Sequence, residues 1–348
     1  MGDKTDIKSL TPKELEIFLK EMGEPSFRAR QIFSWLHKGV CGFDEMTDLS
    51  LKLRDKLAEK SEIVCPNIKK RLVSELDDTI KYLYEFSDGE SVESVLMSYH
   101  HGNTVCISTQ AGCRMNCAFC ASSLKGLSRN LAPSEMLSQV LTTQKDSGRR
   151  ISNVVLMGIG EPLDNYDNVL KFLHILSAPG GINIGQRHIS LSTCGVVDRI
   201  YDLMREKLQI TLSVSLHAPN DEIRSRIMPI NKRWNVDDLL KACRDYIDAT
   251  KRRISFEYAL ISGVNDSPES ARELGAKLRG MLCHVNLIPA NEVKERGLKK
   301  SSSANVARFY DILSEYGLTV TIRRTLGSDI NASCGQLRFK HGAGQGGN

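Results

Sequence analysis

The chain has 348 residues, a mass of 38.8 kDa and a formal net charge of +5, from 47 Lys and Arg against 42 Asp and Glu. Hydrophobic residues make up 41% and charged residues 26%, a globular composition that excludes a largely disordered chain. No stretch approaches the roughly 18 consecutive apolar residues of a membrane span, and residues 1–10 lack the apolar core of a secretion signal. We therefore expect a soluble, cytoplasmic protein of two domains, or of one barrel-sized domain with an appendage.

Positive charge is concentrated after residue 90. Residues 1–90 carry 15 basic and 18 acidic side chains, net −3, and residues 91–348 carry the other 32 and 24, net +8. The basic residues form short clusters, at 149–150, 251–253, 294–300 and 323–324. Such clusters are compatible with a phosphate-rich partner, because each neutralised phosphate releases counterions. Solvated ends of helices and strands carry them more often.

The first predicted elements are three helices within residues 11–60. Residues 11–14 supply an N-cap threonine, a proline at the first helical position and an acid in the first turn. Apolar residues recur at helical spacing after this cap, and again over residues 26–37 and 50–59. We predict a small helical accessory domain over residues 1–62.

A change to period two follows. Residues 81–86 and 92–97 alternate between apolar and polar side chains, and residues 87–89 supply turn chemistry between them. This pattern predicts a β-hairpin connector over residues 63–103.

From residue 104 the pattern alternates between strands and helices. The expected strands cover residues 104–108, 153–157, 188–192, 210–216, 254–260, 284–288 and 319–323. The expected helices include residues 133–147, 165–177, 235–250, 267–280 and 303–316. This alternation predicts parallel strands with helical crossovers, and about 220 residues allow roughly six βα units. We predict an α/β fold, a partial (βα)6 barrel over residues 104–326 with its site at the carboxyl ends of the strands. A loop and a disordered tail follow over residues 327–348.

Ten cysteines are many for a chain of this size: Cys41, Cys65, Cys106, Cys113, Cys117, Cys120, Cys194, Cys243, Cys283 and Cys334. Without a secretion signal we expect no disulfide framework. A buried cysteine usually acts as a small hydrophobic side chain, and this is the role we expect for Cys41, Cys65, Cys243, Cys283 and provisionally Cys194.

Three further cysteines, Cys113, Cys117 and Cys120, follow a predicted strand at C-x3-C-x2-C spacing. Thiolates are soft ligands that suit iron–sulfur clusters or zinc. Three sulfurs from one loop leave the fourth iron of a 4Fe–4S cluster open to a substrate or cofactor, whereas electron-transfer clusters usually have four cysteines. A zinc site would need a distant fourth ligand and usually a second C-x2-C pair, which this sequence lacks. Both metals remain candidates, with iron–sulfur favoured.

The cysteine segment resembles the signature C-x3-C-x-aromatic-C of the radical S-adenosylmethionine (SAM) superfamily, with Phe119 in the aromatic place. The resemblance implies a partial six-unit barrel, a 4Fe–4S cluster held by Cys113, Cys117 and Cys120, and SAM bound to the open iron. In that superfamily the reduced cluster cleaves SAM to methionine and a 5′-deoxyadenosyl radical.

Further segments resemble the adenosine C2 methyltransferase family that modifies 23S ribosomal RNA and transfer RNA. They lie at residues 158–163, 191–195, 213–218, 228–231, 284–291 and 329–337, so the resemblance runs from about Leu10 to Leu337. Most of them end predicted strands, where a barrel site is built. The resemblance implies that SAM is contacted by Gly160, Glu161, Ser192, Ser215, Leu216, His217 and Asn291.

The same resemblance implies a catalytic set of Cys334, Cys106 and Glu93. Cys334 matches a methyl carrier, which is methylated by a first SAM and then loses a hydrogen atom to the radical made from a second. Its methylene radical adds to C2 of the adenine. Cys106 matches the thiol that resolves the adduct through a transient disulfide, and Glu93 matches the acceptor of the C2 proton, a role that burial of a carboxylate can favour.

The partners implied are 23S ribosomal RNA, at its peptidyl-transferase region, and transfer RNA, next to the anticodon. A flavodoxin or ferredoxin would donate electrons, and we expect a monomer that engages no membrane. One alternative is the related C8 methyltransferase, although Pro162 after the Gly-Glu pair favours C2. Another is a non-catalytic iron–sulfur or zinc protein that binds RNA.

Overall fold

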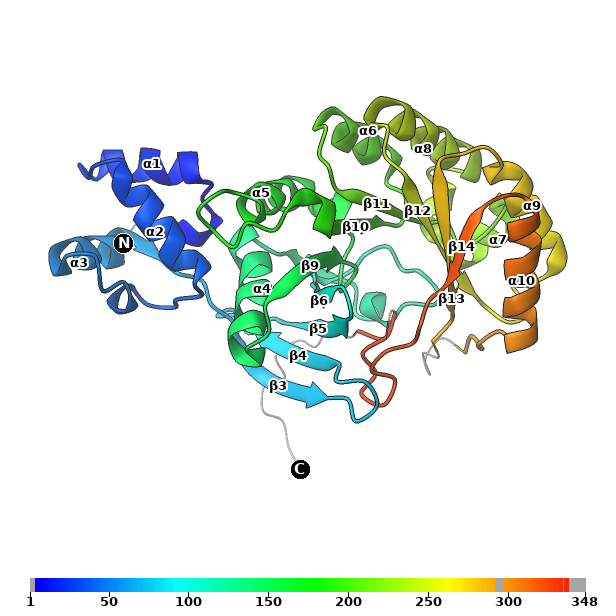
Figure 1. Ribbon diagram of the computed structural model, residues 1–348, viewed down its shortest axis with the longest axis horizontal. Coiled ribbons are helices and arrows are strands. Elements are labelled where there is room, and N and C mark those ends of the chain that lie inside the picture. The colour runs from blue at the N-terminus through cyan, green and yellow to red at the C-terminus, as the bar shows by residue number, and fades with distance from the viewer. Residues whose placement is uncertain (1–3, 292–296, 334, 338–348) are drawn as a thin grey trace.

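The computed structural model describes residues 4–291, 297–333 and 335–337. Three helices form the N-terminal part, α1 (Pro12–Glu21), α2 (Phe27–His37) and α3 (Leu51–Lys60), with a short parallel pair, β1 (Thr5–Asp6) and β2 (Ser61–Glu62). The predicted cap is present, since Thr11 Oγ1 accepts the Glu14 N–H and Glu14 Oε2 accepts the Thr11 N–H. In Figure 1 these helices lie at one side of the molecule, beside two helices of the barrel.

The main sheet in the described residues has ten strands, in the order β14-β13-β12-β11-β10-β9-β6-β5-β4-β3. Seven of them are parallel, β6 (Gly102–Cys106), β9 (Ile151–Leu156), β10 (Ile189–Thr193), β11 (Thr211–Ser215), β12 (Ile254–Leu260), β13 (Cys283–Pro289) and β14 (Thr319–Ile322). Each corresponds to a predicted strand. We call these seven strands the parallel half; they form an open barrel of six βα units that ends on β14, which confirms the predicted fold.

Helices α4 to α6 and α8 to α10 cover the outer face of the parallel half, as Figure 1 shows, whereas α7 lies at the carboxyl ends of β10 and β11. Their bounds are α4 (Pro133–Ser147), α5 (Tyr166–Leu176), α6 (Val197–Arg205), α7 (Asp221–Ile227), α8 (Val236–Thr250), α9 (Pro268–Leu278) and α10 (Ser303–Glu315). Five of the seven match the predicted ranges within two residues; α6 and α7 were not among the helices that the sequence pattern named. None of the helices in the described ranges is long and apolar enough to cross a membrane.

Three antiparallel strands continue the same sheet beyond β6: β3 (Asn67–Val73), β4 (Ile80–Glu85) and β5 (Ser91–Tyr99). We call them the antiparallel half. The predicted hairpin is β4 with β5, which pair antiparallel. Period-two patterning identified the strands, but it could not show that β5 pairs with β6 and so joins the barrel sheet directly.

A single hydrophobic cluster runs from Ile7 in the N-terminal part to Leu337 near the C-terminus. The seam between helices and barrel is also polar: Lys8 Nζ donates to Ser138 Oγ at 3.1 Å, and Glu14 pairs with Lys171 at 2.9 Å. The N-terminal helices therefore share the core of the barrel instead of building one of their own.

The expectation for Cys41 and Cys65 was wrong. Cys41 is exposed and Cys65 is half-buried, and the two form a disulfide across 24 residues of sequence. The missed signal is tertiary, because the chain returns past Cys41 only after α3 has folded back. Cys194, Cys243 and Cys283 are buried as expected. The predicted disordered tail at residues 342–347 lies outside the described residues.

Candidate active site

The candidate site is a cavity at the carboxyl ends of the parallel strands, where the fold predicts it. The open space inside, including the part that reaches solvent, is about 1010 Å³. Its wall includes Ser192 at the end of β10, Ser215 at the end of β11 and Ala259 on β12. The strand ends therefore surround a space that a ligand can enter.

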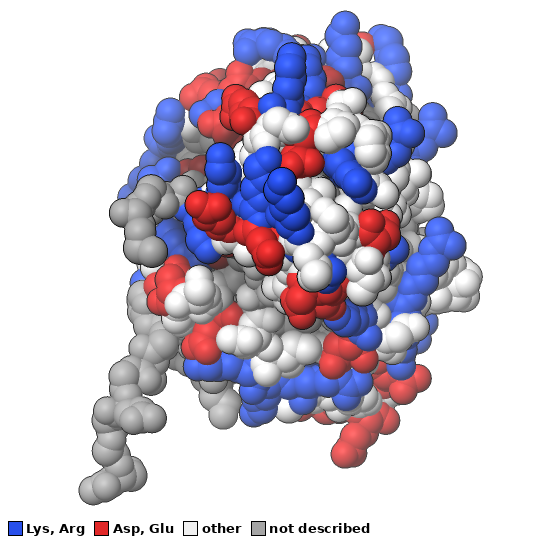
Figure 2. Space-filling model, turned by 90° about the vertical axis from the view of Figure 1, so that its left-hand side faces the viewer, with Lys and Arg blue, Asp and Glu red and all other residues white. Residues whose placement is uncertain are grey.

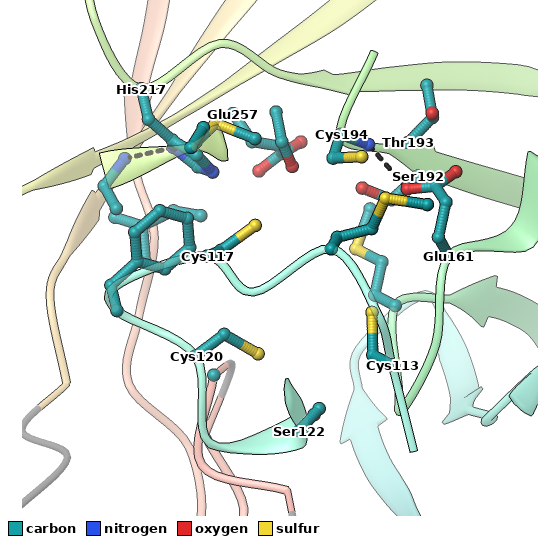
Figure 3. Close-up of a pocket in the computed structure, with 18 of the residues that line it drawn as sticks. Cys113, Cys117, Cys120, Ser122, Glu161, Ser192, Thr193, Cys194, His217 and Glu257 are labelled. Atoms are coloured by element: carbon teal, nitrogen blue, oxygen red, sulfur yellow. Dashed lines mark hydrogen bonds between the residues drawn. The ribbon is translucent and has the colours of Figure 1, made fainter. Parts of the chain in front are cut away.

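Cys113, Cys117 and Cys120 come from one loop and lie along this cavity (Figure 3). The loop leaves a short antiparallel pair, β7 (Gln110–Gly112) and β8 (Leu127–Asn130). The Cys113 N–H donates to the Gly126 carbonyl and the Ala118 N–H to the Ile227 carbonyl, both at 2.8 Å. These bonds fix both sides of the loop, so the three thiols are held together before any ligand binds.

Two of the thiols, those of Cys113 and Cys117, are poorly placed to ionise on their own. Burial raises the pKa of Cys113 to about 12 and that of Cys117 well above its usual value, and the charges of neighbouring thiols and Glu161 act in the same direction. Thiolates at Cys113 and Cys117 therefore need a bound cation.

Glu161 organises the cavity wall. Its side chain is 4% exposed; Oε2 accepts the Cys194 N–H at 2.7 Å and Oε1 accepts the Leu163 N–H at 3.0 Å. Burial raises the pKa of Glu161, and these hydrogen bonds act against the rise. The carboxylate thus ties the loop after β9 to the loop after β10.

The glycines of this loop are required for packing within the protein. A Cβ on Gly160, whose φ is +107°, would lie 2.6 Å from the Gln110 Cβ, and one on Gly158 would lie 2.6 Å from the Ile107 carbonyl oxygen. Their contacts bring the loop after β9 against the strand that leads to the cysteines. Both glycines also line the main cavity.

His217 is a neutral group in the wall. It is 4% exposed, its Nδ1 accepts the Ala259 N–H at 2.9 Å, and Phe119 meets its ring edge-on with centroids 4.6 Å apart. Burial, reinforced by Arg224, lowers the pKa of His217 to about 3. The ring therefore carries its proton on Nε2 and can donate one hydrogen bond, but it does not serve as a cation near neutral pH.

Two buried polar residues at the site escaped the sequence analysis. Arg224 is 0% exposed and donates to the carbonyl oxygens of Cys194, Ser215 and Leu216, so it fastens the ends of β10 and β11. Glu257 on β12 lines the cavity and accepts from Ser255 Oγ and Asn286 Nδ2. The sequence offered one signal for them: each is a charged residue within an otherwise apolar strand or helix pattern. Such groups are rarely buried unless they are paired.

A second, smaller cavity of about 540 Å³, again counting its opening, adjoins the first. Met157, Asn291 and Arg323 line both cavities, and Cys106 lines the second. Cys334 lies outside the described residues; its neighbour Ser333 lines the second cavity and its neighbour Gly335 lines the first.

Two other predicted residues, Glu93 and Leu216, do not line the main cavity. Glu93 is 7% exposed and lines neither cavity, although Val95 and Met97, on the same face of β5, line the second. Its carboxylate pairs with Lys81 Nζ at 3.0 Å. Leu216 is buried and its side chain does not line the main cavity.

Comparisons with known proteins agree with this geometry. The sequence pattern of the Radical SAM superfamily matches residues 107–274, and that of the ribosomal RNA large subunit methyltransferase N-terminal domain matches residues 5–63. A probable dual-specificity RNA methyltransferase RlmN of Alkaliphilus oremlandii is 56% identical over 97% of this chain and 99% of its own. A protein of the same description from Clostridium botulinum is 57% identical over 96% of each chain. The crystal structure of a radical SAM methyltransferase from Sphaerobacter thermophilus superposes with a TM-score of 0.92 at 43% identity, covering 96% of this chain and 99% of that one.

Proposed function

This chain belongs to the RlmN family of dual-specificity RNA methyltransferases, and on that premise we propose that it methylates C2 of an adenine in two RNAs. The two targets are an adenine in the peptidyl-transferase region of 23S ribosomal RNA and one next to the anticodon of transfer RNA. Adenine C2 is electron-poor and has no lone pair to attack a sulfonium methyl group. The methyl group therefore travels by way of a cysteine, which we assign to Cys334, and each turnover uses two molecules of SAM.

The main cavity fits the cofactors of this family. Three soft thiols converge from one loop, their buried thiolates need a cation, and neutral hydrogen-bonding groups stand opposite them at the strand ends. Cys113, Cys117 and Cys120 would hold a 4Fe–4S cluster and leave its fourth iron to SAM. When bound, the cluster supplies the electron that splits SAM and so provides a radical able to take hydrogen from an S-methyl group.

For SAM itself we propose two kinds of residue. Ser192, Ser215, His217 and Asn291 line the main cavity with neutral polar groups, and they would bind the ligand directly. Gly160 also lines the cavity, and its backbone would contact the ligand. Glu161 and Leu216 would act by shaping the wall, because the Glu161 carboxylate and the backbone N–H groups of both residues already bond to the protein. Binding through neutral donors spares the site the cost of burying unpaired charge.

The second cavity is our candidate for the target adenine. Cys106 there would attack the Cys334 sulfur once the carbon has moved to C2, forming a disulfide and releasing the methylated base. Glu93, one strand away, would accept the C2 proton. The base must leave any stack to reach this depth, and the flanking Arg323 and Arg324 suit its phosphates.

Shape is the better basis for RNA recognition by the N-terminal helices. Basic and acidic side chains are interspersed over the face they present (Figure 2), in keeping with the net −3 of residues 1–90. Simple electrostatic docking needs a surface of one sign. The basic cluster at residues 294–300 is only partly described, because residues 294–296 lie outside the described residues. We further propose a cytoplasmic monomer that takes electrons from a flavodoxin or ferredoxin.

The observation that carries this function is the three-cysteine loop opening into the cavity at the strand ends. Anaerobic protein should be brown, and with SAM, a reductant and unmodified RNA fragments it should yield 2-methyladenosine by mass analysis of nucleosides. A colourless preparation with one metal ion, or 8-methyladenosine as product, would contradict the proposal. Cys334→Ala should keep the colour and lose methylation; methylation at the wild-type rate would remove Cys334 from the carrier role.

A further inference from the structure

The segment that leads to Cys334 is fastened to the turn between β3 and β4. We call residues 327–333 and 335–337, on either side of Cys334, the strap. Ser74 Oγ donates to Asp329 Oδ1 at 2.7 Å and the Glu75 N–H donates to Asp329 Oδ2 at 2.9 Å. In return, the Gly327 N–H donates to Asp77 Oδ2 at 2.8 Å. Two carboxylates, one on each side, thus join the strap to the turn.

The other end of the strap is fastened to the cysteine loop. The Ala121 N–H donates to the Gly335 carbonyl at 2.8 Å, and Ser122 Oγ donates to the Leu337 carbonyl at 2.9 Å. Ala121 directly follows Cys120. The strap therefore spans from the antiparallel half of the sheet to the loop proposed to hold the cluster.

Lys81, at the start of β4, connects the strap to Glu93. The lysine is 8% exposed; its Nζ lies 3.0 Å from Glu93 Oε1 and donates to the Asn331 carbonyl, also at 3.0 Å. Asn331 is three positions before Cys334 and has a φ of +51°. One buried ammonium thus touches both the proposed base and the chain that carries the proposed thiol.

Stability alone is a weak reason for such a contact. Burying a Lys–Glu pair removes two charges from water, and apolar side chains of similar volume often serve a fold as well or better. A buried pair is better explained where geometry matters, because a misplacement of about 1 Å at a reacting group can slow a reaction on the order of 100-fold.

We propose that Lys81 is a positioning residue that holds Glu93 and the strap in one fixed arrangement, with the β3–β4 turn as the anchor. This inference rests on the proposed function for the roles of Glu93 and Cys334. The anchoring itself is a property of the chain and can be measured without turnover.

Lys81→Met tests the proposal, with Lys69→Met as its matched control. Lys69 on β3 pairs with Glu85 on β4, so this pair also joins neighbouring strands of the antiparallel half, but it lies at the end of β3 and β4 away from their turn and the Lys69 side chain is 47% exposed. In the holoenzyme, Lys81→Met should speed amide hydrogen exchange in peptides covering residues 325–337 and leave peptides of the parallel half unchanged. Lys69→Met should leave both sets at wild-type rates.

Product ratios supply the functional readout. Lys81→Met should lower the yield of methylated adenosine on the order of 100-fold. The yield of 5′-deoxyadenosine should fall much less, so the ratio of 5′-deoxyadenosine to methylated adenosine should rise. Lys81→Arg should restore most of the coupling, since arginine can also bridge a carboxylate and a carbonyl. A merely structural lysine would lower both products together, in proportion to the folded and cluster-loaded fraction.

The outcomes are distinct. Wild-type exchange and an unchanged product ratio in Lys81→Met would overturn the positioning role. If that variant does not fold, Asp329→Asn, which weakens the anchor at an exposed residue, should produce the same selective exchange in the strap, and wild-type exchange there would equally overturn the proposal. Absence of methylated adenosine from loaded wild-type protein would instead sink the proposed function and leave the exchange comparison to judge the anchor.

Discussion

The two halves of the sheet divide the proposed chemistry between them. In the parallel half, strands alternate with covering helices, and the strand ends and the cysteine loop line the main cavity. In the antiparallel half no helix is inserted between β3, β4, β5 and β6, and its buried polar pair, Lys81 with Glu93, faces the strap. The superfamily pattern covers residues 107–274, which lie after the antiparallel half. On the proposed function, the comparison teaches that the radical is made in the parallel half, whereas the proton acceptor Glu93 and the anchor of the strap lie in the added strands.

The largest effect should come from the parallel half. Cys117→Ala removes one of the three proposed cluster ligands, so we expect the brown colour, 5′-deoxyadenosine and methylated adenosine all to disappear. Iron content, visible absorption and product analysis check this. Formation of 5′-deoxyadenosine at the wild-type rate in this variant would contradict the assignment of the radical step to the cysteine loop of the parallel half.

Cys106→Ala should separate the radical step from the release of the methylated base. The cluster should form and the radical step should proceed, because Cys106 lines only the second cavity. Without the resolving thiol the carbon bridge between Cys334 and the adenine should persist, so a covalent protein–RNA adduct should accumulate at close to one per active site. Denaturing electrophoresis with labelled RNA detects it, and free 2-methyladenosine at the normal rate would exclude Cys106 from the scheme.

Glu93→Gln should have a smaller effect, since general base catalysis contributes roughly 10²- to 10⁴-fold. We expect methylation to slow within that range, with cluster content and 5′-deoxyadenosine formation retained. Glu90→Gln is the control, because Glu90 is a half-buried carboxylate in the turn just before β5 and lies outside the Lys81 pair. Equal methylation rates in the two variants would place the proton acceptor elsewhere.

The sequence predicted the parallel half better than the antiparallel half, for a physical reason. Buried parallel strands are apolar runs separated by helical periodicity, so local pattern alone located all seven, as well as α4 with both ends correct. The disulfide between Cys41 and Cys65 joins residues 24 positions apart, and the docking of Asp329 on Ser74 joins residues 255 positions apart. Such contacts leave no periodic trace.

The same limit applied to the site. The cysteine loop could be identified because its three ligands lie within eight residues, and the glycines after β9 because they precede a turn. Arg224 and Glu257 show only as charged residues in otherwise apolar patterns, and their place in the site depends on partners elsewhere in the fold, such as the Cys194 carbonyl and Asn286 Nδ2. Resemblance supplied Cys106 and Glu93, but only the structure shows Lys81 between Glu93 and the strap.

The smallest effect concerns the seam by which the parallel half carries the N-terminal helices. His37 at the end of α2 is 7% exposed, and its Nδ1 accepts the Ile182 N–H, from the loop after α5, at 3.1 Å. Burial, with a contribution from Lys8, lowers the pKa of His37 to about 4. The unfolded chain binds a proton near pH 6.5 and the folded chain does not, so stability is complete above pH 6.5 and is lost as the pH falls towards 4.

At pH 5 this imbalance should cost about 2 kcal/mol, from about 1.5 pH units at 1.36 kcal/mol each. His37→Asn keeps an acceptor for the Ile182 N–H but cannot titrate. Between pH 7.5 and pH 5 the unfolding free energy of this variant should therefore fall by about 2 kcal/mol less than that of wild type. His101→Asn, at an exposed histidine stacked on Tyr99, should follow the wild-type curve. Parallel curves for wild type and His37→Asn would mean that acid weakens the molecule elsewhere, and His217, buried and neutral in the parallel half, would then be the group to test.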